Sequence, residues 1–146
     1  MTIATEAFAQ FLREREAASL DYVRGQGESF MALAASDGAA SFFPPGGGFV
    51  EGVTDVNERY AKDVQAFDEK TESSRFEIFH SGADGDIGYW TGLQHARVQM
   101  KGQDEPVAMT LRVTEVFRQG TGGWKIVHRH ADLLAEPQAK PGGSGG

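Results

Sequence analysis

The sequence contains no cysteine, and this absence removes several kinds of chemistry. Without thiols there is no disulfide framework, no thiolate nucleophile and no cysteine-ligated metal, so packing alone must hold the fold. No apolar run approaches the roughly 20 residues of a membrane span, and we expect no membrane partner. Basic residues are also in deficit, 14 against 21 acidic ones, and a formal charge of −7 disfavours nucleic acid as a partner.

The first ten residues lack the basic cluster and apolar stretch of a secretory signal, so we expect a cytoplasmic protein. A chain of 146 residues with 40% hydrophobic and 24% charged residues fits one soluble domain. Its end, Pro-Gly-Gly-Ser-Gly-Gly, offers no core-forming side chains. We therefore predict a domain over residues 1–134 and a flexible tail over residues 135–146.

Helical spacing of apolar residues marks the first half of the chain. It predicts one helix over about residues 5–23 and a short second helix over about residues 30–34. Residues 41–52 contain Phe-Phe-Pro-Pro and three consecutive glycines, which predict a short strand followed by a loop. A third helix is expected to follow, with Thr54 or Asp55 as its N-cap.

Strand periodicity replaces helical periodicity near residue 75. Turn-forming residues separate four predicted strands, at residues 75–81, 87–101, 107–118 and 124–133. Helices followed by an antiparallel meander predict an α+β fold in which a curved sheet wraps around the helices. The concave side is expected to bind a small-molecule ligand. The opposite face is left bare, so we expect a homodimer.

The last two predicted strands carry a recognisable pattern. Leu111-Arg-Val-Thr-Glu-Val-Phe117 and Gly123-Trp-Lys-Ile-Val-His-Arg-His130 resemble the final hairpin of the SnoaL-like and kinase-association branches of the nuclear transport factor 2-like superfamily. The pattern is similar above all to the association domain of calcium/calmodulin-dependent protein kinase II. The segments Phe43-Pro-Pro-Gly and Val50-Glu-Gly52 also fit this superfamily. Over about residues 5–134, the resemblance implies a cone-shaped antiparallel sheet around N-terminal helices, the cystatin-like fold.

The resemblance implies a fold more sharply than a function, because this fold hosts isomerases, cyclases, dehydratases, epoxide hydrolases and non-catalytic modules. In ketosteroid isomerases the catalytic base is an aspartate where this chain has Phe43. Tyr22 lies about one turn from the position of their first-helix tyrosine. Both departures disfavour isomerisation by that mechanism.

The candidate catalytic residues lie on the last hairpin. Glu115 shares one strand face with apolar residues, where burial would raise its pKa into a range useful for acid–base chemistry. The alternative is that Glu115 pairs with a neighbouring arginine or lysine. His128 and His130 share a face of the next strand and could move protons or bind ligand. Their alternative role is hydrogen bonding at a sheet or dimer interface.

Hairpin register decides whether these groups meet. If Phe117 pairs with Trp124, both histidines share the face of Glu115. If Arg118 pairs with Trp124, Glu115 shares its face with Arg129 and the histidines lie on the other side. Matching apolar with apolar side chains favours the first register, whereas the resemblance supports either.

Five further residues are candidates for ligand binding. Trp90, Phe43 and Tyr22 would shape the cavity, although a tryptophan in this pattern often packs in the core. Arg112 and Arg129 could clamp a carboxylate, as the arginine-lined cavity implied by the kinase-domain resemblance suggests. The alternative for both arginines is a salt bridge to Glu115, Asp132 or another acid.

We expect no metal and no cofactor, because two histidines need further ligands that only His80, His95 or Glu115 could supply. Two functions fit the sequence. One is an isomerase-, cyclase-, dehydratase- or hydrolase-type enzyme acting on a small, largely apolar substrate, in which Glu115→Gln abolishes turnover and leaves the fold intact. The other is a non-catalytic ligand-binding or oligomerisation module whose arginines hold an anion.

Overall fold

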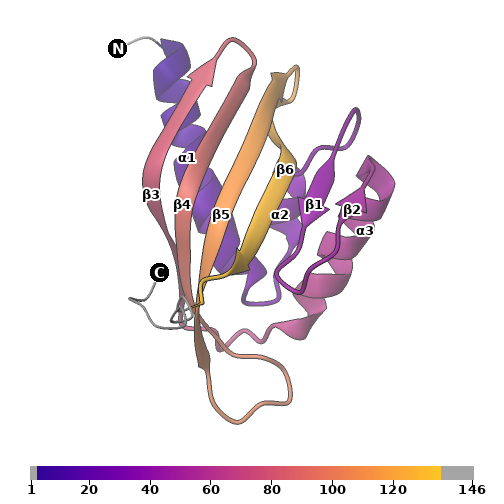
Figure 1. The fold of residues 1–146 in the computed structure, drawn as a ribbon, viewed down its shortest axis with the longest axis vertical. Helices are drawn as coiled ribbons and strands as arrows, with labels where there is room; N and C mark the ends of the chain where they lie inside the picture. The colour runs from indigo at the N-terminus through magenta and orange to yellow at the C-terminus, as the bar shows by residue number, and fades with distance from the viewer. Residues whose placement is uncertain (1–2, 136–146) are drawn as a thin grey trace, which may run out of the picture.

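Three α-helices lie against one side of a curved six-stranded sheet in the computed structural model, which describes residues 3–135 (Figure 1). This arrangement confirms the predicted α+β fold. The helical elements are α1 (Ile3–Tyr22), α2 (Glu28–Leu33), α3 (Val53–Asp63) and the short 3-10 helix η1 (Val64–Ala66). The strands are β1 (Ser41–Phe43), β2 (Val50–Glu51), β3 (Ser73–Asp84), β4 (Ile87–Val98), β5 (Val107–Gly120) and β6 (Gly123–Leu133).

The sheet has the strand order β2-β1-β6-β5-β4-β3. Strands β3 to β6 form the predicted antiparallel meander. Strand β1 pairs with β6 in parallel and with β2 antiparallel, so the Pro- and Gly-rich segment extends the sheet beyond the meander. Apart from residue 135, the predicted tail lies outside the described residues. Within residues 3–135, none of the helices is long and apolar enough to cross a membrane.

The start of α3 differs from the expected one. Gly52 occupies the N-cap position with φ of 98°, and no side chain caps the helix there. A glycine tolerates this positive φ, so the chain turns directly from β2 into the helix. Thr54 and Asp55 consequently lie inside the first turn, and the prediction that one of them is the N-cap is wrong.

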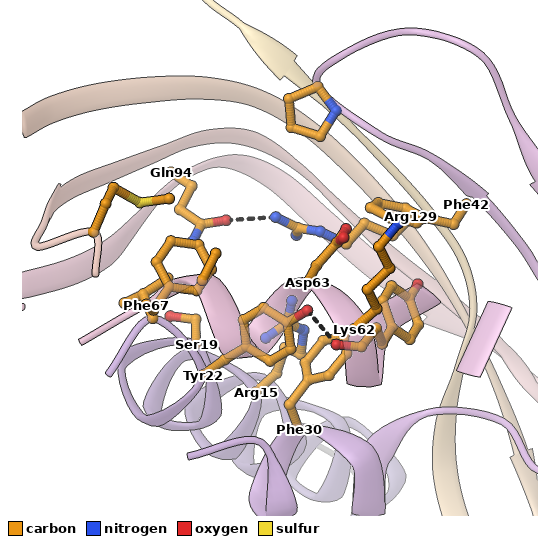
Figure 2. Close-up of a pocket in the computed structure, with 15 residues that line it drawn as sticks. Arg15, Ser19, Tyr22, Phe30, Phe42, Lys62, Asp63, Phe67, Gln94 and Arg129 are labelled. Atoms are coloured by element: carbon orange, nitrogen blue, oxygen red, sulfur yellow. Dashed lines mark hydrogen bonds between the residues drawn. The ribbon is translucent and has the colours of Figure 1, made fainter. Parts of the chain in front are cut away.

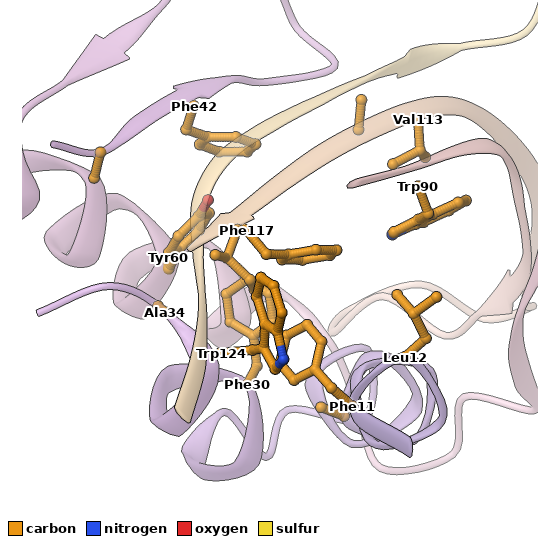
Figure 3. Packing of buried hydrophobic residues seen from close by; sticks show 14 of the residues in the cluster. Phe11, Leu12, Phe30, Ala34, Phe42, Tyr60, Trp90, Val113, Phe117 and Trp124 are labelled. Carbon is orange, nitrogen blue, oxygen red and sulfur yellow. The ribbon is translucent and has the colours of Figure 1, made fainter. Parts of the chain in front are cut away.

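An aromatic core joins α1 to the sheet (Figure 3). The ring centroids of Phe11 and Phe117 are 4.8 Å apart in an edge-to-face arrangement, and those of Phe8 and Trp124 are 5.0 Å apart. Such contacts combine a large buried area with favourable ring geometry. They fill one end of the space between α1 and the sheet, and the polar site described below occupies the other.

A β-bulge interrupts the hairpin of β5 and β6. Phe117 pairs with Ile126 and Val116 pairs with His128, so Val127 has no partner residue on β5. The favoured register, with Phe117 opposite Trp124, is therefore wrong, and Trp124 pairs with Gln119 instead. Because a bulge reverses the alternation of side chains, residues on both sides of it face the helices. Trp124, Ile126 and Ala131 are buried there, and Arg129 lies opposite Glu115.

Candidate ligand-binding site

A cavity of about 380 Å³ lies between the concave side of the sheet and the helices (Figure 2). Aromatic side chains form much of its wall, namely Tyr22, Phe30, Phe42, Tyr60 and Phe67. Arg15 from α1, Gln94 from β4 and Arg129 from β6 bring polar groups to its inner end. Lys62 is exposed and marks the side that opens to solvent. The lining has the composition of a small-molecule site, apolar with a few convergent polar groups.

Glu115 lies beneath the inner end of this cavity and is completely buried. Arg15 donates two hydrogen bonds to its carboxylate, from Nε at 2.9 Å and from Nη2 at 2.7 Å. Arg129 Nη1 donates a third at 2.6 Å, and Trp90 Nε1 donates a fourth at 2.8 Å. A carboxylate has about four lone-pair positions, so its acceptor capacity is used.

The charge state of Glu115 follows from these partners. Burial by itself raises the pKa of this carboxyl, but the charges of Arg15 and Arg129 and the hydrogen bonds from Arg15 and Trp90 lower it to about 2. The prediction that burial raises the pKa of Glu115 into a catalytic range is therefore wrong. The side chain is buried among charged and hydrogen-bonding partners and not among apolar groups alone. The alternative of arginine pairing describes the observed environment.

A hydrogen-bond relay fixes the orientation of the Gln94 side chain. Ser19 Oγ donates to the backbone carbonyl of Glu16 at 2.7 Å, so the 3.0 Å bond between the two serine hydroxyls must be donated by Ser74. Ser74 Oγ then accepts from Gln94 Nε2 at 3.0 Å. Gln94 Oε1 is left to accept from Arg129 Nη2, at 2.9 Å. The relay therefore holds one terminal nitrogen of the Arg129 guanidinium, while the other donates to Glu115.

Arg15 retains unused hydrogen-bonding capacity. Its side chain is 2% exposed, and its Nη1 has no hydrogen-bond partner among residues 3–135. The guanidinium carbon lies 4.7 Å from the ring centroid of Phe30 and 5.3 Å from that of Phe76, so aromatic faces enclose it. Arg15 and Arg129 carry two positive charges against the single negative charge of Glu115. The inner end of the cavity therefore has one uncompensated positive charge.

Two tyrosines contribute neutral groups to the wall. The hydroxyl of Tyr22 donates to the backbone carbonyl of Tyr60 at 2.7 Å, as the dashed line in Figure 2 marks. Burial raises the pKa of both tyrosines, with the charge of Asp63 adding to the effect at Tyr22. Both side chains are protonated at neutral pH. Tyr22 thus lies in the cavity wall, as its prediction as a ligand-binding residue requires.

The histidines of the hairpin lie on the outer face of the sheet, away from Glu115. His128 Nδ1 is 2.6 Å from Ser41 Oγ, and its ring contacts Phe43. Partial burial and the nearby His130 lower the pKa of His128. His130 Nε2 is 3.3 Å from Asp132. The acid–imidazole pair expected from the favoured register does not form, because the bulge places Arg129 opposite Glu115.

Two predicted ligand contacts also lie on the outer face. Arg112 makes a bidentate salt bridge with Asp132 at 2.7 and 2.9 Å, which raises the pKa of Arg112 and lowers that of Asp132. Phe43 is 39% exposed and packs on the histidine rings, whereas its neighbour Phe42 lines the cavity. Trp90 is buried behind the cavity wall and reaches Glu115. Of the predicted ligand-binding residues, Tyr22 and Arg129 line the cavity.

Arg15 and Gln94 were missed by the sequence analysis, although both carry a detectable signal. Arg15 is one helical turn from Phe11 and from Ser19, and therefore lies on the apolar stripe of α1. Gln94 alternates with Trp90 and Ala96 on the buried face of β4. A polar residue at an apolar position in either pattern marks a buried polar group. Within the described residues, no group of histidine, aspartate or glutamate side chains is placed to hold a metal.

The fold and the cavity define a class of protein, a small α+β domain whose curved sheet encloses a pocket lined by aromatic residues and arginines. A family model described as a SnoaL-like domain matches residues 8–136. The chain therefore belongs to the SnoaL-like family, as the sequence predicts. A search of curated proteins gives no significant match.

Solved structures share this fold at low sequence identity. A proposed dehydratase of the nuclear transport factor 2-like family from Streptomyces avermitilis is 22% identical, with TM-score 0.66 over 90% of this chain and 96% of that one. A proposed calcium/calmodulin-dependent kinase II association domain from Exiguobacterium sibiricum is 15% identical, with TM-score 0.68 over 92% of this chain and 96% of that one. The CaMKII hub of S. rosetta is 16% identical, with TM-score 0.66 over 92% of this chain and 99% of that one. At these identities the similarity establishes the fold alone.

Proposed function

We propose that this protein binds a small organic anion, a carboxylate with an apolar body, in the cavity between the sheet and the helices. The observation that carries the proposal is the pair of arginines in the lining of that cavity, Arg15 and Arg129, which share the single counter-charge of Glu115. A charge-assisted hydrogen bond to a ligand carboxylate would compensate the remaining positive charge. The aromatic wall would accept the body of the ligand.

Glu115 is a poor candidate for acid–base catalysis. Its four hydrogen bonds occupy the lone pairs that would receive a substrate proton. With a pKa of about 2 it is ionised at neutral pH and is a weak base. Its role in the proposal is to position Arg15 and Arg129, and this supports ligand binding over the enzyme hypothesis.

Binding of 3-phenylpropanoate and of its neutral amide tests the proposal. We expect the acid to bind at least about tenfold more tightly, since a hydrogen bond to a charged group contributes about 1.5–3 kcal/mol. Arg129→Met should weaken binding of the acid by about tenfold or more. Arg112→Met is the matched control, because it removes the same charge from the outer face. Calorimetric titration measures all four affinities, and equal loss in both variants would contradict the assignment of the cavity.

We further propose that the outer face of the sheet binds a second copy of the chain. In the described residues no helix covers this face, and it carries a groove lined by Phe79, Leu93 and Leu134. Phe79 is 60% exposed and Leu134 is 51% exposed. The paired Arg112 and Asp132 supply both signs of charge, as a self-complementary interface needs. The association and hub domains among the structural neighbours support assembly of this kind.

A further inference from the structure

The charge of the site depends on a residue that is itself neutral. Arg129 is held between two acceptors, the carboxylate of Glu115 and the side-chain oxygen of Gln94. Only the first carries a charge. If both acceptors were carboxylates, two arginines would face two acids, and the inner end of the cavity would have no net charge to offer a ligand.

We propose that Gln94 sets the charge of the ligand, so that the site selects molecules with a single negative charge. The inference rests on the proposed anion binding and specifies it further. The residue is a specificity-determining one, because it lines the cavity and contacts the guanidinium that would meet the ligand. The amide oxygen of Gln94 accepts a hydrogen bond from Arg129 but carries no negative charge to compensate the guanidinium.

Burial makes this single charge decisive. Gln94 is 4% exposed, the side chain of Arg129 is 11% exposed and Glu115 is fully buried. Water therefore screens these groups poorly, and a change of one charge has a large effect on an ion brought among them. The other charged residues of the lining, Lys62 and Asp63, are of opposite sign and adjacent in sequence.

The fold has the means to accommodate a carboxylate at position 94. In Gln94→Glu, one oxygen would accept from Arg129 and the other would replace the amide nitrogen that now donates to Ser74. The Ser74 hydroxyl would then donate to the new carboxylate, and Ser19 would donate to Ser74 instead of the backbone. Because hydroxyl groups rotate freely between such arrangements, every hydrogen bond of Arg129 is kept.

The test compares 3-phenylpropanoate with 3-phenylpropanamide in the wild type and in Gln94→Glu, using the full chain. We expect the ratio of acid to amide affinity to fall at least about tenfold in Gln94→Glu, because the added negative charge cancels the net positive charge that favours the acid in this poorly screened site. Gln119→Glu is the control, because it adds the same charge at an exposed position of β5 and should keep the wild-type ratio. A wild-type ratio in Gln94→Glu would overturn the inference and leave anion binding intact.

Two further results distinguish a failure of this inference from misfolding of the variant and from a failure of the proposed function. Gln94→Met keeps the side chain neutral, so it should bind both molecules less tightly and keep the preference for the acid. Loss of that preference in a folded Gln94→Met protein would overturn the inference even if Gln94→Glu does not fold. A wild-type protein that binds neither molecule would reject the proposed function and this inference together.

Discussion

Glu115 accepts hydrogen bonds from Arg15, Trp90 and Arg129, which come from α1, β4 and β6. A carboxylate in this position stabilises the fold only when it is ionised, because its partners are donors and two of them are cations. The fall of its pKa from 4.5 to about 2 corresponds to roughly 3 kcal/mol of folding free energy. That contribution is complete above pH 4.5 and is lost as the pH falls toward 2.

Glu115→Gln is accordingly expected to destabilise the protein by about 3–5 kcal/mol at pH 7, because it leaves two buried guanidinium groups without a counter-charge. This corrects the sequence-based expectation that the fold would survive the change unaltered. Glu77→Gln, at an exposed position on β3, is the control and should change stability by about 0.5 kcal/mol or less. Chemical denaturation at pH 7 and pH 3 measures both, and the deficit of Glu115→Gln should shrink at pH 3. A deficit independent of pH would contradict the account.

Sequence reasoning located Glu115 and Arg129 and named a salt bridge between them as one alternative, but it did not identify Arg15 as a partner. The alternation of β5 placed Glu115 on the buried face, which the structure confirms. The sign of its pKa shift depends on Arg15, which is 100 residues distant in sequence. Long-range pairing of this kind is fixed by tertiary packing, which local periodicity does not report.

Two β-bulges shape the sheet at the scale of its elements. The first, in β6, lets Trp124 and Arg129 both face the helices despite their odd separation. The second lies in β3, where Ile78 pairs with Gly92, His80 pairs with Thr91 and Phe79 has no partner on β4. A bulge increases the local bend and twist of a strand, which suits a sheet that must curve around helices.

Gly92 is required where β4 faces the second bulge. A Cβ at this position would overlap the backbone carbonyl of Glu77, so Gly92→Ala should cost about 1–3 kcal/mol as an overpacked site. Gly82→Ala is the matched control in β3, since its Cβ would lie 3.4 Å from the Tyr89 ring. Thermal unfolding compares the two variants. Equal melting temperatures would mean that the strands can separate at Gly92 without loss.

Apart from β2, which lies in the predicted loop, and the 3-10 helix η1, the order and type of the elements followed from the sequence. The structure confirms the α+β fold and the meander. The sequence did not reveal which side chains of β6 face the helices. Both registers considered for the hairpin assumed unbroken alternation, and one unpaired residue, Val127, makes Ile126 and Arg129 face the same side. Alternating polarity gives no signal for a single inserted residue, so the bulge became visible only in three dimensions.

The whole molecule presents two different faces of one sheet. The helices lie on the concave side (Figure 1), where the cavity is also found. The outer face exposes Phe43 and Phe79. Phe79 lines the outer groove together with Leu134, and this exposed apolar pair supports the proposed interaction surface. The proposed ligand site and the proposed dimer interface would therefore be separated by the thickness of the sheet.

Phe79→Ser is expected to shift a wild-type dimer toward the monomer, because it removes an exposed aromatic side chain from the outer groove. Val107→Ser is the control, since Val107 is 49% exposed but does not line that groove. Light scattering coupled to size-exclusion chromatography gives the mass of each protein. A wild type with the mass of one chain would reject the dimer, and identical masses for all three would reject this surface.

The central claim is that an uncompensated positive charge at Arg15 and Arg129 makes the cavity a site for an organic anion. Calorimetric titration of the wild-type protein with 3-phenylpropanoate and 3-phenylpropanamide tests it most directly, because the two molecules share a body and differ in charge. The account predicts that the acid binds at least about tenfold more tightly than the amide. Equal affinities, or tighter binding of the amide, would contradict it.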